Sequence, residues 1–208
     1  MVLLESLVAD SKTLLLVIDI QKDFCAWGSG YAYYERNHHD VIALQDMVDN
    51  NLFPFIKEAQ EHIKVAYIQS SYRHNQFPEM PNLCIPHTPG WEFYAITPNE
   101  ENGEVVLTKH SHDPFNGSLG KYLEESEFST ILIAGVTTDR CIRQAAHAVA
   151  KTKYLPIVIK DCVSTAGYKL HTAHEKTLKE FEAHSSIGLI ESTKVKFSLS
   201  ETIAAYSQ

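Results

Sequence analysis

The chain has 208 residues, of which 44% are hydrophobic and 21% are charged, and these values are typical of one globular domain, which we expect over residues 1–208. The formal net charge of −8 and the absence of a basic run argue against nucleic-acid binding, and no apolar run approaches the roughly 20 residues that span a bilayer. The N-terminal residues lack a signal-peptide pattern, so we expect a cytoplasmic protein with four free cysteines.

Apolar runs typical of strands alternate with helical patterns along the first half of the chain. Residues 13–20 (TLLLVIDI) form a continuous apolar run, as expected of a strand buried on both faces. Residues 40–61 carry apolar side chains at helical spacing, with Pro54 placed to break or kink that helix. Residues 63–70 predict the next strand. The segment 71–93 holds four prolines, and a loop of this length is more often functional than not.

The same alternation continues to the end of the chain. Residues 198–201 (SLSE) are typical of a capping box that opens a last short helix. Strands separated by helices predict right-handed crossovers and a mainly parallel sheet with helices on both faces. The remaining strands are predicted at residues 104–110, 130–136, 154–161 and 187–192, and the helices between them at 119–127, 139–151 and 168–184.

Three polar residues lie at or just after the ends of predicted strands. Asp19 is near the end of the first strand, Lys109 ends the third, and Cys141 follows the fourth. Ligands of open parallel sheets bind outside the carboxyl ends of the strands. A buried carboxylate is costly unless it is paired, and a lysine at a neighbouring strand end would supply that pairing.

These three residue types together predict nucleophilic catalysis. A cysteine at a helix N-terminus beside a lysine is expected to have a lowered pKa and to be partly thiolate. The thiolate would attack a carbonyl carbon, and the aspartate would move the proton to the leaving amine. Taken singly, Cys141 also fits a structural core thiol, Asp19 a loop or capping group, and Lys109 a solvated surface residue.

Three segments resemble the isochorismatase-like cysteine hydrolases: VIDIQKDF at residues 17–24, LTKHSHDPFNGSLG at 107–120 and IAGVTTDRCIRQAAHAVA at 133–150. The superfamily includes nicotinamidases, N-carbamoylsarcosine amidases, ureidoacrylate and biuret hydrolases, and isochorismatase. The resemblance covers about residues 13–193. It implies an α/β fold, a three-layer α/β/α sandwich with a six-stranded mainly parallel sheet, and assembly as a homodimer or homotetramer.

The resemblance also implies roles for individual residues. The family's catalytic triad corresponds to Asp19, Lys109 and Cys141. A cis peptide is expected between Val136 and Thr137, and the backbone N–H groups of Thr137 and Cys141 would form the oxyanion hole.

Substrate contacts are predicted at positions that match the family's pocket. Gln21 is expected to contact the substrate or to anchor a loop, and Phe24 and Phe115 to line the pocket or to pack in the core. Trp91 lies in a segment, HTPGWEF, that the family places near the pocket mouth. Arg73 is the chosen partner for a substrate carboxylate, because a guanidinium binds a carboxylate through two hydrogen bonds.

The chain departs from nicotinamidases at their metal site. Ser70 and Ser71 stand where a metal-binding aspartate is expected, and His74 and His87 alone do not make a convincing site. We therefore expect no metal and no other cofactor. The preferred function is cleavage of a C–N bond in a small amide, ureido or carbamoyl compound. The alternatives are a metal-dependent nicotinamidase, an isochorismatase-type hydrolase, or a non-catalytic binding relative.

Overall fold

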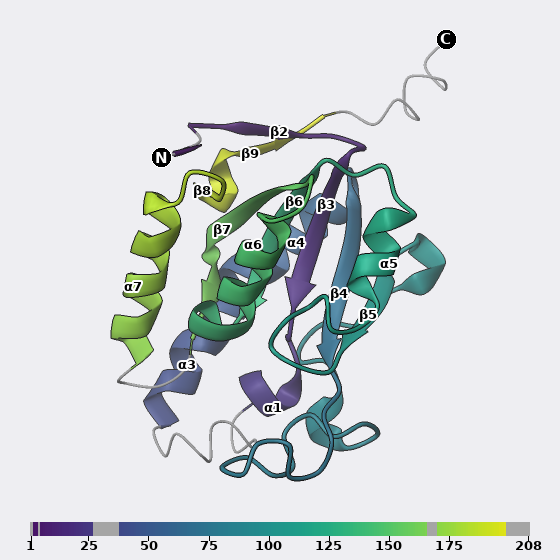
Figure 1. Cartoon of the computed structure of the whole chain (residues 1–208), viewed down its shortest axis with the longest axis vertical. Coiled ribbons are helices and arrows are strands. Elements are labelled where there is room, and N and C mark those ends of the chain that lie inside the picture. Colours follow the sequence, from purple (N-terminus) through teal and green to yellow (C-terminus); the bar gives the residue numbers. More distant parts are fainter. Residues whose placement is uncertain (1, 4, 27–37, 166–169, 199–208) are drawn as a thin grey trace.

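The structure of the chain is a computed structural model that describes residues 2–3, 5–26, 38–165 and 170–198. Its centre is a sheet in the order β1-β8-β7-β6-β3-β4-β5, in which all neighbouring strands run parallel (Figure 1). The six predicted strands are confirmed, and β1 adds a short seventh at one edge. The strands of this sheet are β1 (Val2–Leu3), β3 (Thr13–Ile18), β4 (Lys64–Ser70), β5 (Val105–Lys109), β6 (Thr130–Val136), β7 (Leu155–Ser164) and β8 (Gly188–Ile190).

Helices cover both faces of the sheet, which confirms the predicted three-layer sandwich. They are α1 (Lys22–Cys25), α3 (His38–Met47), the π-helical η1 (Val48–Leu52), α4 (Phe53–Gln60), the 3₁₀ turns η2 (Pro89–Trp91), η3 (Glu100–Asn102) and η5 (Ser192–Lys194), α5 (Leu119–Glu124), the π-helical η4 (Thr138–Ile142), α6 (Arg143–Val149) and α7 (Leu170–Ala183). Side chains of a strand alternate between faces. In β3, Leu15 and Val17 share a core with α3, η1 and α4, whereas Leu14 and Leu16 share a core with α5, α6 and α7 (Figure 1).

The helix predicted over residues 40–61 is one continuous helical segment, and Pro54 does not break it. Pro54 lies in the first turn of α4, directly after the π-helical η1. A proline in a helix removes one backbone donor and crowds the preceding turn. The wider π-helical turn lies directly before Pro54, where the proline ring would crowd an α-helical turn. The backbone therefore stays helical at Leu52 and Phe53.

A second, small sheet lies beyond the amino end of β3. It pairs β2 (Leu7–Ala9) with β9 (Val195–Phe197) in parallel. Sequence periodicity does not predict these strands of three residues each. The capping box expected at residues 198–201 extends outside the described residues. Within the described residues, no helix combines the length and apolar character needed to cross a bilayer.

Candidate active site

The three strand-end residues meet where the winding of the sheet reverses. From β3 the chain adds β4 and β5 on one side, and then returns to add β6, β7 and β8 on the other side. The carboxyl ends of β3 and β6 therefore border the crevice in which open α/β sheets bind their ligands. Asp19 follows β3, Cys141 follows β6 in η4, and Lys109 ends β5. Their exposed fractions are 0%, 3% and 0%, so all three are buried.

The Lys109 ammonium is the centre of the cluster. Its Nζ lies 2.9 Å from Asp19 Oδ2 and 3.4 Å from Cys141 Sγ. It also donates to the Ser111 carbonyl at 3.1 Å. The aspartate and the lysine compensate each other's charge inside the protein, as a buried ion pair must. The predicted contact of the three strand ends is therefore present in the geometry.

Ser70 and Tyr72 complete this cluster. Ser70 Oγ lies 2.8 Å from Asp19 Oδ1 and 2.8 Å from Lys109 Nζ. Tyr72 places its hydroxyl 2.8 Å from Ser70 Oγ and 3.1 Å from Lys109 Nζ. The sequence prediction missed both as members of the site. The rule that found the other three could have found them, because Ser70 ends β4, between β3 and β5, and Tyr72 follows two residues later.

The prediction of a lowered thiol pKa is wrong for the resting site. Burial raises the pKa of Cys141 to about 12, and Lys109, which acts in the opposite direction, does not offset burial and the Asp19 carboxylate together. Burial alone would lower the pKa of Lys109, but Asp19 and the neighbouring Cys141 and Tyr72 raise it well above its usual value. The resting site therefore holds a neutral thiol beside an ammonium–carboxylate pair.

The turn that carries Cys141 depends on a close approach of two strands. Gly135 has a φ of 118° and pairs with Ile18 of β3. A Cβ at this glycine would lie 2.1 Å from the Ile18 carbonyl oxygen, so a larger residue would push the strands apart. The peptide bond between Val136 and Thr137 is cis. Thr137 is buried and caps η4, four residues before Cys141.

Gln21 has the loop-anchoring arrangement, one of the two roles that its position in the sequence predicts. Its side-chain Nε2 donates to the carbonyls of Ser70 at 3.0 Å and Trp91 at 2.8 Å, and its Oε1 accepts from the Ser70 N–H at 2.8 Å. The side chain is fully buried. Its amide therefore ties the end of β4 to the long loop.

Asp23 anchors the same loop at a second point. Its Oδ2 accepts from the Cys84 N–H at 2.6 Å. A Cβ at Gly90 would lie 2.0 Å from Asp23 Oδ1, so only glycine leaves room for this carboxylate. The stretch after Asp19 thus holds the loop over the carboxyl edge of the sheet.

The other predicted substrate contacts lie at different depths. Phe24 is buried in the core on the α3 side, and Trp91 packs against that core. Phe115 is half-buried and packs against the opposite core. Arg73 is exposed in the loop, and its backbone N–H donates to Gln76 Oε1 at 3.1 Å. Tyr72 belongs to the same core as Phe24 and Trp91, and Cys141 belongs to the core against which Phe115 packs. The substrate roles of all four side chains stay predictions.

The residues near the family's metal position do not fit a metal centre. His74 is exposed and pairs with Asn82, and the ring of His87 packs against Trp91. Ser70 is engaged with Asp19 and Lys109. Across the described ranges, no group of three or more His, Cys, Asp or Glu side chains is arranged to hold a metal ion.

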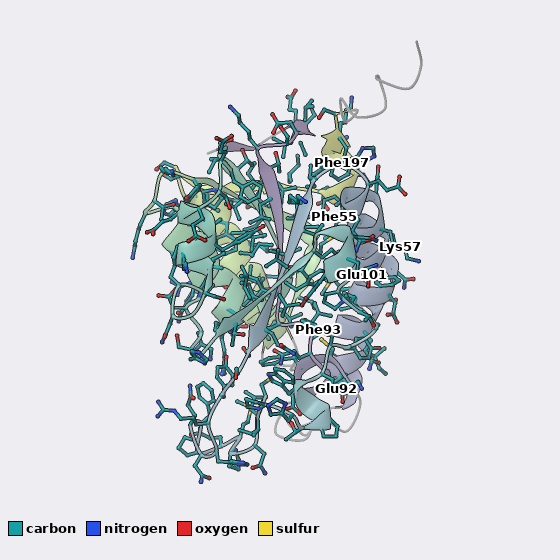
Figure 2. The ribbon with its side chains drawn as sticks, turned by 90° about the vertical axis from the view of Figure 1, so that its right-hand side faces the viewer. Phe55, Lys57, Glu92, Phe93, Glu101 and Phe197 are labelled. Carbon is teal, nitrogen blue, oxygen red and sulfur yellow. The ribbon has the colours of Figure 1, made fainter. Side chains whose placement is uncertain are left out.

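A cavity of about 770 Å³ lies away from the cluster, between α4, β4 and the segment around η3. Figure 2 looks onto the side of the molecule that carries Lys57 of α4 and Glu101 of η3. The cavity lining includes Tyr67 and Glu104 but none of Asp19, Lys109 and Cys141. This cavity therefore does not contain the candidate nucleophile.

Comparisons with known proteins agree with this fold. The chain is 28% identical over 172 residues to a "Probable inactive nicotinamidase" of Arabidopsis thaliana, with 80% of this chain and 88% of that protein covered. It is similar to the crystal structure of an isochorismatase-like hydrolase from Alkaliphilus metalliredigens, with a TM-score of 0.69, 22% identity, and 95% and 100% of the two chains covered.

A second similar structure is a pyrazinamidase of Pyrococcus horikoshii in complex with zinc. Its TM-score is 0.66 at 20% identity, with 86% of this chain and 99% of that chain covered. The profile of the family described as "Isochorismatase domain" matches residues 13–186, which include all three residues of the candidate triad. The chain belongs to the isochorismatase family.

Proposed function

We propose that the protein is a cysteine hydrolase that cleaves a C–N bond of a small amide, ureido or carbamoyl compound. The observation that carries this proposal is the contact of Asp19, Lys109 and Cys141 at the switch point of the sheet. A buried thiol in core packing needs no ion pair beside it. Here the thiol lies against a charged pair that can take up its proton and stabilise the resulting thiolate.

The first half of the reaction forms a thioester. Cys141 Sγ attacks the carbonyl carbon of the substrate as Asp19 takes the thiol proton. The N–H groups of Thr137 and Cys141 stabilise the negative oxygen of the tetrahedral intermediate. Asp19 then gives the proton to the leaving nitrogen, and ammonia or an amine departs.

The second half returns the enzyme to its starting state. A water molecule attacks the thioester carbon, and Asp19 accepts one of its protons. When the C–S bond breaks, that proton returns to the sulfur and the acid product leaves. Lys109 stays protonated throughout, because its pKa is raised well above the usual value by the charges around it. Its role is to hold the carboxylate and to stabilise the transient thiolate.

The test is ammonia release from a panel of small amides, ureides, carbamoyl compounds and nicotinamide. Wild type should turn over at least one member, and Cys141→Ala should lose at least about 10³-fold in kcat, as expected when a nucleophile is removed. Cys162→Ala is a matched control, because Cys162 is also a buried free thiol but lies in the core on the other face of the sheet from Cys141. Full turnover by Cys141→Ala would refute the proposal.

A metal-dependent nicotinamidase is the second enzymatic candidate, favoured by the similarity to a zinc-bound pyrazinamidase. It predicts that turnover of nicotinamide stops when a chelator is added. The name of the Arabidopsis relative favours a third candidate, a binding protein without turnover. That candidate predicts that Cys141 forms no thioester with any panel member. Mass spectrometry of the enzyme after incubation with each compound would detect a thioester.

Assembly is also a proposal. We propose a homodimer or homotetramer of a single-domain chain, in which a neighbouring subunit helps to close the substrate pocket. Light scattering on the purified protein would give the mass, to be compared with 23.5 kDa for one chain.

A further inference from the structure

We propose that Ser70 and Tyr72 are positioning residues for the reaction. Their two hydroxyls hold the side chains of Asp19 and Lys109 in a fixed orientation relative to the thiol of Cys141. This inference rests on the proposed function. Neither residue belongs to the candidate triad. In the sequence, Ser70 stood out only because it occupies the position of the metal-binding aspartate of nicotinamidases. The structure shows what that serine contacts instead.

The direction of each hydrogen bond follows from the number of protons available. A carboxylate only accepts and an ammonium only donates, whereas a hydroxyl donates once and accepts twice. Ser70 lies 2.8 Å from both Asp19 Oδ1 and Lys109 Nζ, so its one proton goes to the carboxylate and it accepts from the ammonium. Its second lone pair then accepts from Tyr72, whose hydroxyl lies 2.8 Å away.

Tyr72 is held so that it can only serve this chain of bonds. Its side chain is buried, and the ring of Phe77 packs edge-on against it at 4.9 Å between centroids. Burial and the neighbouring sulfur of Cys141 raise the pKa of Tyr72, so its hydroxyl stays protonated across the working pH range. It can therefore donate to Ser70 while it accepts from Lys109 at 3.1 Å.

The consequence concerns the geometry of proton transfer. Ser70 donates a hydrogen bond to one oxygen of Asp19 and the Lys109 ammonium pairs with the other, so both contacts oppose rotation of the carboxylate. A catalytic carboxylate must keep the orientation in which it meets the thiol proton, because small misplacements are costly in rate. Removal of the Ser70 hydroxyl frees that rotation and withdraws a donor from the charged form of the carboxylate.

The experiment compares Ser70→Ala, Tyr72→Phe and the double variant. We expect Ser70→Ala to lower kcat by about 10- to 100-fold with KM within about threefold, similar to the loss of other orienting hydrogen bonds. Its acidic limb in the pH–rate profile should move to higher pH. Tyr72→Phe should lose about 3- to 10-fold, and the double variant should resemble Ser70→Ala, because Tyr72 acts mainly through Ser70.

A second readout needs no substrate. Alkylation of Cys141 by iodoacetamide, followed by mass spectrometry of its peptide, should be several-fold slower at pH 7.5 in both single variants. Ser71→Ala and Tyr122→Phe are the matched controls: Ser71 is the adjacent serine, and Tyr122 is a half-buried tyrosine of α5. Both should match wild type in both readouts.

The outcomes separate this inference from the proposed function. Unchanged alkylation rates in Ser70→Ala and Tyr72→Phe, or unchanged kcat and pH profile beside an inactive Cys141→Ala, would overturn the positioning role and leave the function standing. Full activity of Cys141→Ala would overturn the function itself. If Ser70→Ala does not fold, Tyr72→Phe carries the test, since it removes one oxygen and keeps the ring.

Discussion

Two buried polar clusters lie along β4 and β5, and they differ in the chemistry that their residues allow. At the carboxyl end, β4 and β5 carry Ser70 and Lys109, which meet Asp19 and Cys141. Near the amino end of β5, Glu104 is 7% exposed and accepts from the side chains of Gln60 and Tyr67. The large cavity borders this second cluster.

The difference lies in the partners of the buried charge. Glu104 is held by neutral donors, including the Asn99 N–H, and each of its oxygens accepts a hydrogen bond that closes the fold around α4. Lys109 instead pairs with a carboxylate, and a thiol lies 3.4 Å away. A buried charge with neutral partners stabilises a structure. A buried ion pair beside a nucleophile can also move a proton.

The largest expected effect in this comparison comes from breaking the ion pair. Lys109→Met leaves the Asp19 carboxylate buried without its counter-charge, and we expect a loss of about 3–5 kcal/mol in the free energy of unfolding, together with all turnover. Urea denaturation measures the first and ammonia release the second. Asp19→Asn/Lys109→Met should be less destabilised than Lys109→Met alone, because no unpaired charge remains. Asparagine also tolerates the φ of 59° at position 19.

The matched control for Lys109→Met is Lys121→Met. Lys121 has an 80% exposed side chain and lies 3.8 Å from Glu125. Exposed pairs of this kind contribute about 0–1 kcal/mol. A similar loss of stability in both variants would mean that the buried pair is not special, and the contrast between the two clusters would fail.

A smaller effect is expected at the second cluster. Glu104→Gln keeps the shape but places an amide N–H₂ among donors, and we expect a loss of about 1–2 kcal/mol in the free energy of unfolding. Turnover should not change, since the cluster holds no nucleophile. Glu101→Gln, at an exposed residue of η3 that Figure 2 labels, should leave both stability and turnover unchanged. Loss of turnover in Glu104→Gln with stability intact would assign a catalytic role to the second cluster.

The features of the fold and of the candidate site that follow from the order of strands and helices could be predicted from the sequence. Continuous apolar runs identify buried strands, and the order of strands and helices is enough to place Asp19, Lys109 and Cys141 at one edge of a parallel sheet. The π-helical η1 and η4 escaped prediction, because apolar spacing over five residues does not distinguish them from an α-helix. The strands β2 and β9 are too short to show a period.

The protonation state of Cys141 could not be predicted from chain order either. A nearby lysine and a helix start argue for a thiolate, but the outcome depends on how completely the sulfur is removed from water. The fold buries it almost fully, and this burial is the largest influence on its pKa. Only the packing around the sulfur decides which influence prevails.

The effect confined to the narrowest range of conditions tests that protonation state through stability at alkaline pH. The pKa of Cys141 is raised from 9.0 to about 12 in the folded protein. Between these values the unfolded chain has lost the thiol proton and the folded chain has kept it. The unfolded state binds fewer protons, so the free energy of unfolding falls as pH rises, by up to about 1.4 kcal/mol per pH unit from this one group. Below pH 9 the group contributes no pH dependence.

Comparison of wild type with Cys141→Ala under reducing conditions isolates this contribution. Other buried thiols, such as Cys25, also have raised pKa values, but their share is the same in both proteins. The free energy of unfolding of wild type minus that of Cys141→Ala should stay constant up to about pH 9 and then decrease. If Cys141 were instead a resting thiolate paired with Lys109, its folded pKa would lie below the unfolded value. The difference would then change in the acidic to neutral range and stay flat above pH 9, and the neutral-thiol description of the site would be wrong.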